Sequence, residues 1–93
     1  MRRAAITFVA AMTGEQADAL ARLMEEGRSA RPDGVLAAML AWEDGVGTLT
    51  AVWRDRETLD HYLSVAAVPR GTELMRRLGL EPEVRAFDLL EFD

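Results

Sequence analysis

Two apolar strands joined by a tight turn constrain the fold of this chain more than any other feature. The strands are expected at Val35–Trp42 and Gly47–Trp53, and Asp44 and Gly45 between them form a strong hairpin signal. The first strand has no polar face, because Leu36, Ala38, Leu40 and Trp42 alternate with Val35, Ala37, Met39 and Ala41. Antiparallel strands with one solvated face alternate apolar and polar residues. We therefore expect this strand to be buried on both faces.

A strand and the start of a helix precede the hairpin. Ala4–Ala11 predicts a strand whose two faces carry Ile6 with Phe8 and Thr7 with Val9. Thr13 and Gln16 then match a capping box, in which each side chain bonds the backbone N–H of the other residue. A helix is therefore predicted to begin directly after the first strand.

This first helix has an amphipathic pattern and a glycine at its end. Its predicted apolar stripe, at three- and four-residue spacing, consists of Ala17, Leu20, Ala21, Leu23 and Met24. Gly27 predicts a stop in the left-handed conformation. The segment Arg28–Gly34, with its Pro, Asp and Gly, predicts a loop that leads back to the hairpin.

The second half of the chain repeats the order of strand, helix and strand. Asp55 is a predicted N-cap, and the helix after it has the stripe Leu59, Tyr62, Leu63 and Ala66. A short helix is expected at Gly71–Leu78, ending at Gly79, and a last strand at Val84–Phe92. The order βαββαβ predicts one α+β domain over residues 1–93, a ferredoxin-like sandwich with a four-stranded antiparallel sheet and helices on one face.

The face of the sheet away from the helices would be apolar and uncovered. Four strands of ordinary spacing and length give such a face an area of about 400 Å². Patches of that size mark interfaces, so we expect a homodimer packed sheet to sheet.

Composition excludes several classes of function. A net charge of -5 argues against a nucleic-acid partner, which needs a basic patch. The chain has no cysteine, so thiolate metal sites and cysteine nucleophiles are excluded, and no apolar run is long enough to span a membrane. The stretch MRRAAITFVAAM imitates a signal peptide, but it supplies a strand that the sheet needs, so we expect a cytoplasmic protein.

The segment Val52–Ser64, VWRDRETLDHYLS, carries a resemblance to a known family. It resembles the small antibiotic-biosynthesis-monooxygenase (ABM) domains of the dimeric α+β barrel superfamily, in which a strand runs through an acidic, arginine-containing turn into a helix of the type "ALxxHL". The resemblance implies a pocket between the sheet and the helices. It also implies chemistry such as cofactor-independent oxygenation, haem degradation, polyketide cyclisation or isomerisation. The family's usual helix histidine falls on Tyr62, one position after His61.

Six residues are candidates for such a site. His61 or Tyr62 would be the catalytic base, Trp42 and Trp53 would be walls for an aromatic ligand, and Thr7 and Thr50 would orient it. Each also has a plain structural interpretation, as a surface histidine, as core or dimer packing, or as strand-forming threonines. Haem is disfavoured because His61 is the only histidine, and the carboxylates show no metal-ligand spacing.

Two functions remain open. The first is a small enzyme, a monooxygenase or cyclase without a cofactor, acting on a hydroxylated aromatic or polyketide-type compound. The second is a non-catalytic ligand-binding or regulatory module of the same fold. A third function, RNA binding on the sheet, is disfavoured because the central strands have Ala, Leu, Val and Thr in place of basic and aromatic residues.

Overall fold

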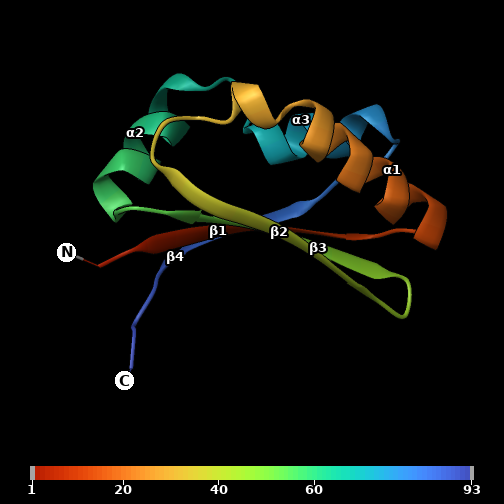
Figure 1. Cartoon of the computed structure of the whole chain (residues 1–93), viewed down its shortest axis with the longest axis horizontal. Coiled ribbons are helices and arrows are strands. Elements are labelled where there is room, and N and C mark those ends of the chain that lie inside the picture. Colours follow the sequence, from red (N-terminus) through yellow and green to blue (C-terminus); the bar gives the residue numbers. More distant parts are fainter. Residues whose placement is uncertain (1, 93) are drawn as a thin grey trace.

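In the computed structural model, which describes residues 2–92, three helices cover one face of a four-stranded antiparallel sheet (Figure 1). The strand order β2-β3-β1-β4 is that of a ferredoxin-like fold, as the sequence predicts. In chain order, the elements are β1 (Ala4–Ala11), α1 (Gly14–Glu26), a 3-10 turn (Arg28–Ala30), β2 (Val35–Glu43), β3 (Val46–Trp53), α2 (Arg56–Val65), α3 (Arg70–Arg77) and β4 (Glu83–Asp88).

The predicted local signals fix the starts of two helices and the hairpin turn. The Thr13 hydroxyl accepts from the Gln16 backbone N–H at 3.1 Å, and the Gln16 side chain accepts from the Thr13 N–H at 2.9 Å. The Asp55 carboxylate accepts from the Thr58 N–H at 2.7 Å, which caps α2. Asp44 and Gly45 both have positive φ, 50° and 81°, which matches the twist of a two-residue hairpin turn.

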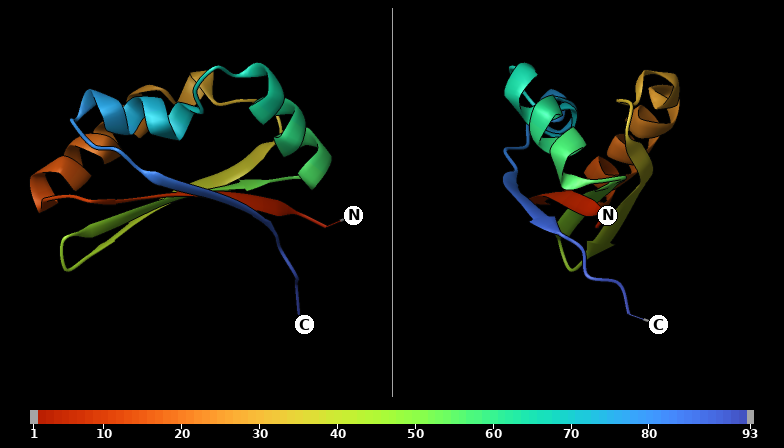
Figure 2. Two further views of the ribbon diagram at one scale, coloured as in Figure 1. Left: turned by 180° about the vertical axis from the view of Figure 1, so that it is seen from behind. Right: turned by 90° about the vertical axis from the view of Figure 1, so that its left-hand side faces the viewer.

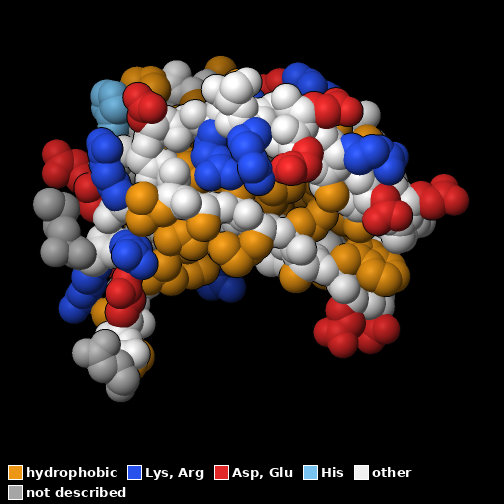
Figure 3. Space-filling view, viewed as in Figure 1, with side chains coloured by type: hydrophobic (Ala, Val, Ile, Leu, Met, Phe, Trp, Pro, Cys, Tyr) orange, Lys and Arg blue, Asp and Glu red, His pale blue; other side chains and the backbone are white. Residues whose placement is uncertain are grey.

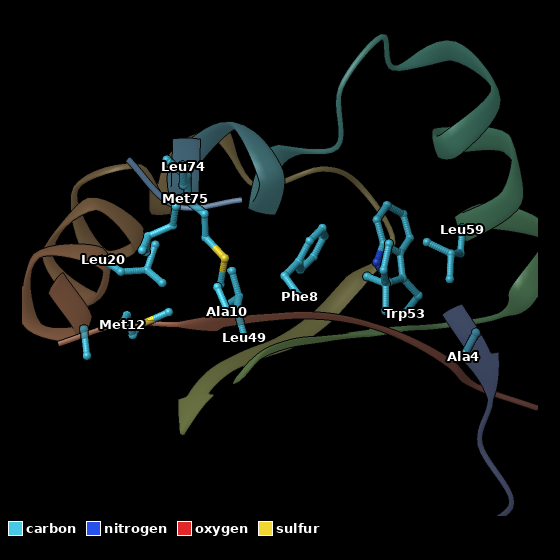
Figure 4. Close-up of a cluster of buried hydrophobic side chains, with 13 residues drawn as sticks. Ala4, Phe8, Ala10, Met12, Leu20, Leu49, Trp53, Leu59, Leu74 and Met75 are labelled. Atoms are coloured by element: carbon cyan, nitrogen blue, oxygen red, sulfur yellow. The ribbon is translucent and has the colours of Figure 1, made fainter. Parts of the chain in front are cut away.

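The hydrophobic core lies between the sheet and the helices (Figure 4). Its largest fully buried side chains are Trp53, Leu20, Leu59 and Met75. Ile6 and Phe8 of β1 point into this core, whereas Thr7 and Val9 are only partly buried and lie on the other face. Viewed end-on, α1 lies above the β2 side of the sheet, and α2 and α3 lie above the β4 side (Figure 2).

A β-bulge changes the predicted face of Val35. Val35 is opposite Trp53 and Ala37 is opposite Val52, so Leu36 is the extra residue on β2. Such a residue reverses the alternation on one side of the bulge. Val35 therefore packs against the core, and Leu36 is half-exposed, in contrast to the strict alternation that the sequence predicts.

Three further details correct the sequence predictions. Gly27 has φ of -93°, so it is not a left-handed stop; a Cβ there would collide with the guanidinium of Arg70, and the glycine is needed for this close approach. Ala21 is exposed rather than part of the buried stripe of α1. The last strand ends at Asp88, well before Phe92.

The other face of the sheet is uncovered in the single chain and carries both apolar and polar side chains. Met39 of β2, Val46 of β3 and Phe87 of β4 are each more than a third exposed. Beyond β4 the chain runs away from the helices (Figure 1), where Leu90 and Phe92 are exposed. Within residues 2–92, no helix has the length and apolar character needed to cross a membrane.

Candidate functional site

A cavity of about 130 Å³ lies between the sheet and the helices. Ile6, Phe8 and Leu49 contribute to its apolar floor, and Met24 and Leu74 contribute from the helices. It meets the solvent where its lining includes exposed side chains near the end of α1. A dry apolar cavity of about 150 Å³ is enough to bind benzene. The enclosed part of this cavity therefore has room for about one aromatic ring, and a larger ligand would extend through the mouth.

Trp53, the last residue of β3, lines this cavity and has a buried hydrogen-bond donor. Its side chain is 2% exposed, yet the indole Nε1–H has no hydrogen-bond partner among the described residues. Figure 4 shows the indole nitrogen on the side of the ring that faces Phe8, which also lines the cavity. A buried donor without a partner destabilises the fold, so a ligand oxygen that accepts from it would remove that cost.

Tyr62 of α2 lies beside Trp53 and also lines the cavity. The two ring centroids are 5.0 Å apart with planes inclined by 38°. The Tyr62 hydroxyl accepts from the backbone N–H of Arg70 at 2.8 Å. Pro69, which precedes α3, provides no side-chain cap, so this hydroxyl serves the first turn of α3 instead. The tyrosine O–H finds no acceptor among residues 2–92 and remains free to donate.

Arginines surround the part of the cavity where α1 ends and α3 begins. Arg28, Arg31 and Arg70 all belong to the lining, together with Glu25. Figure 3 shows basic side chains gathered directly above the hydrophobic surface in the middle of that view. Arg70 donates through Nη2 to the Gly27 carbonyl at 2.9 Å, and Arg28 pairs with Glu25 at 3.2 Å.

His61 and Trp42 lie away from the cavity. His61 is exposed on α2 and is absent from the lining. Trp42 is 47% exposed at the far end of β2, and its Nε1–H donates to the Met12 carbonyl at 3.0 Å.

Thr7 and Thr50 are direct partners across β1 and β3, on the uncovered face of the sheet. Of the six candidates, the structure therefore brings only Trp53 and Tyr62 together in the cavity. The sequence analysis did not predict the three arginines of the cavity. Arg28 and Arg31 lie between α1 and β2, and Arg70 is the first residue of α3. The arginines in the Arg28–Gly34 loop were the one available signal.

Clustered metal ligands are absent from the part of the chain that the structure describes. Within residues 2–92, no three His, Cys, Asp or Glu side chains are grouped to hold a metal ion. The only histidine, His61, is outside the cavity. The altered acid pKa values also lie elsewhere: the Thr58 backbone N–H lowers the pKa of Asp55, and the hydrogen bond from Arg76 lowers the pKa of Glu81.

Solved structures of similar fold place this architecture among the ABM-like α+β domains. One of these structures is SnoaB, a cofactor-independent oxygenase from Streptomyces nogalater. The match covers 99% of this chain and 97% of SnoaB, with a TM-score of 0.65 and 15% sequence identity. A second is a protein from Chloroflexus aurantiacus assigned to the antibiotic biosynthesis monooxygenases. The match covers 98% of this chain and 96% of that protein, with a TM-score of 0.61 and 21% sequence identity. A third, from Deinococcus radiodurans, has the same assignment. The match covers 97% of this chain and 95% of that protein, with a TM-score of 0.63 and 15% sequence identity.

These identities establish a shared fold. No protein-family model and no curated protein matches the sequence. The chain thus has the ferredoxin-like α+β fold that these ABM-type structures share.

Proposed function

We propose that this protein is a small cofactor-independent enzyme, of the monooxygenase or cyclase type, that acts on a hydroxylated aromatic compound in the cavity between sheet and helices. The observation that supports this most is the unpartnered, buried Nε1–H of Trp53, whose ring lines an apolar cavity together with the ring of Tyr62. Ligand sites are mostly apolar, with a few polar groups that fix orientation. The fold shared with SnoaB, a cofactor-independent oxygenase, supports the same class of chemistry.

The two donors suit a substrate that reacts as an anion. A hydroxylated aromatic that loses a proton to water at the cavity mouth becomes electron-rich and can itself reduce molecular oxygen. One oxygen atom then enters the ring, which becomes a quinone, and the other leaves as water. Hydrogen bonds from Trp53 and Tyr62 would stabilise the anionic substrate oxygen, and the same bonds would stabilise an enolate in a cyclisation. His61 lies outside the cavity and takes no part in this proposed chemistry.

Oxygen uptake tests this function directly. The purified protein would be mixed with one-, two- and three-ring hydroxylated aromatics, without added metal, haem or flavin. We expect oxygen consumption above the protein-free rate for at least one compound. Trp53→Phe with Tyr62→Phe should lose this activity, whereas Trp42→Phe should keep it, since Trp42 does not line the cavity.

The alternative is a non-catalytic ligand-binding or regulatory module. Saturable binding in the cavity with no oxygen consumption and no change in the ligand would favour that alternative. Absence of binding by every aromatic compound tested would contradict both.

We also propose that two copies pack through their uncovered sheet faces. The chain exposes 6034 Å², whereas a compact monomer of its mass exposes about 5,400 Å². Covering the excess on both copies would bury about 1,300 Å², which falls within the range of specific interfaces. The exposed Leu90 and Phe92 leave the sheet on the same side and would add to this contact.

A further inference from the structure

We propose that the ligand of the cavity is an aromatic acid, whose ring lies against Trp53 and whose carboxylate is held at the mouth by Arg31, with Arg70 beside it. This inference rests on the proposed function, since it takes the cavity as the ligand site. Beyond the proposed function, it specifies the charge of the ligand and names the residue that selects for that charge.

The charge of the lining differs from the charge of the whole chain. The chain carries a net charge of -5, but the cavity lining contains three arginines and one glutamate, and no other carboxylate. One of these arginines, Arg28, is paired with that glutamate, Glu25. The two remaining guanidinium groups give the mouth a positive charge in an otherwise acidic protein.

Arg31 is the arginine with the clearest need for an anion. It is only partly exposed, and it forms no ion pair and no side-chain hydrogen bond with any residue of 2–92. By contrast, six other arginines pair with carboxylates, namely Arg3, Arg28, Arg54, Arg56, Arg76 and Arg77. A partly desolvated charge is stabilised by a partner, so an anionic ligand would supply what the chain does not.

Arg70 is positioned for the same ligand. Its hydrogen bond to the Gly27 carbonyl holds the guanidinium against the end of α1, and this uses only one of its five N–H donors. Its backbone N–H meanwhile donates to Tyr62, whose ring lines the cavity. Arg70 therefore connects the fixed aromatic wall to the charged mouth.

A carboxylate on an aromatic ring matches this arrangement in shape as well as charge. The planar fork of a guanidinium binds a carboxylate through two parallel hydrogen bonds. The enclosed volume takes about one ring, so a substituent on that ring reaches the mouth without a long linker. A neutral ring of the same size would leave Arg31 unpaired.

Calorimetric titration with a matched pair of compounds tests the inference. The probes are 4-hydroxybenzoate and its neutral counterpart 4-hydroxybenzamide, each titrated into the wild type, Arg31→Gln and Arg22→Gln. Arg22 is exposed on α1 and does not line the cavity, so its variant loses the same charge at a position away from the ligand. Circular dichroism would verify that both variants fold.

We expect the wild type to bind the acid about tenfold or more tightly than the amide, because hydrogen bonds to charged groups are the stronger kind. Arg31→Gln should lose this preference while keeping its affinity for the amide. Arg22→Gln should keep the preference, and salt should weaken binding of the acid more than binding of the amide.

Equal binding of acid and amide by the wild type would overturn the inference and leave the proposed function standing. Equal loss of the preference in Arg31→Gln and Arg22→Gln would also overturn it, because the attraction would then be a property of the whole surface. Binding of neither probe would count against the proposed function itself.

Discussion

At the scale of single residues, burial separates side chains that the sequence cannot distinguish. Trp42 and Trp53 both lie near strand ends, but one donates to Met12 and is half-exposed, whereas the other is buried with an unpartnered N–H. His61 and Tyr62 are adjacent in sequence, but a helix turns by about 100° between neighbours. Only Tyr62 faces the cavity.

Tyr62 also has a structural role that can be measured. Tyr62→Phe removes the acceptor of the Arg70 backbone N–H, a partly buried group at the start of α3. We expect the free energy of unfolding to fall by about 1 kcal/mol. Denaturant unfolding measures the loss, and amide exchange at Arg70 should become faster. Unchanged stability together with unchanged exchange at Arg70 would show that this hydrogen bond does not support α3.

At the scale of elements, features set by neighbours in the sequence were predictable, and features set by distant contacts were not. The capping box at Thr13 and the turn at Asp44 and Gly45 depend on a few adjacent residues, and both are confirmed. The bulge at Leu36 depends on the pairing of β2 with β3. At Gly27 the close contact is with Arg70, which is 43 residues away, so no local pattern could reveal it.

The candidate site follows the same rule. Trp53 and Tyr62, which the sequence marks as candidates for a wall and for a base, meet because they lie on either side of one strand-to-helix turn. The arginines of the mouth come from a loop and a helix that meet only in the folded chain, and they were missed.

The cap of α2 predicts a pH dependence. The Thr58 backbone N–H lowers the pKa of Asp55 below its usual value of 3.8 in the folded protein. The ionised cap therefore contributes stability above about that pH, and this contribution is lost as the pH falls through the lowered pKa. Asp55→Asn keeps a capping acceptor that does not titrate. We expect its stability to fall less than that of the wild type in denaturant unfolding between about pH 5 and about pH 2. Parallel losses in the two proteins would contradict this role.

At the scale of the whole molecule, the arrangement of helices leaves one face of the sheet for a partner. All three helices lie on one side (Figure 2), and the row Met39, Thr50, Thr7 and Arg85 crosses the other. The candidate threonines Thr7 and Thr50 thus belong to the proposed dimer face rather than to the cavity.

Light scattering tests the dimer. We expect the wild type to have the mass of two 10.3 kDa chains. Met39→Glu places a charge on the uncovered face and should shift the mass toward that of one chain, because burying an unpaired charge is costly. Val65→Glu is the matched control, since Val65 is exposed on α2, on the side of the helices. A single-chain mass for the wild type, or equal effects of the two variants, would contradict the proposed interface.

The central claim is that an aromatic ligand occupies the cavity and accepts a hydrogen bond from Trp53. Two tryptophans give two indole N–H signals in a ¹H–¹⁵N NMR spectrum, and Trp42→Phe assigns them. On titration with 4-hydroxybenzoate, we predict that the Trp53 signal moves progressively to saturation while the Trp42 signal, already bonded to Met12, stays in place. A Trp53 signal that does not respond to this or any other hydroxylated aromatic, or movement of the Trp42 signal alone, would contradict the account.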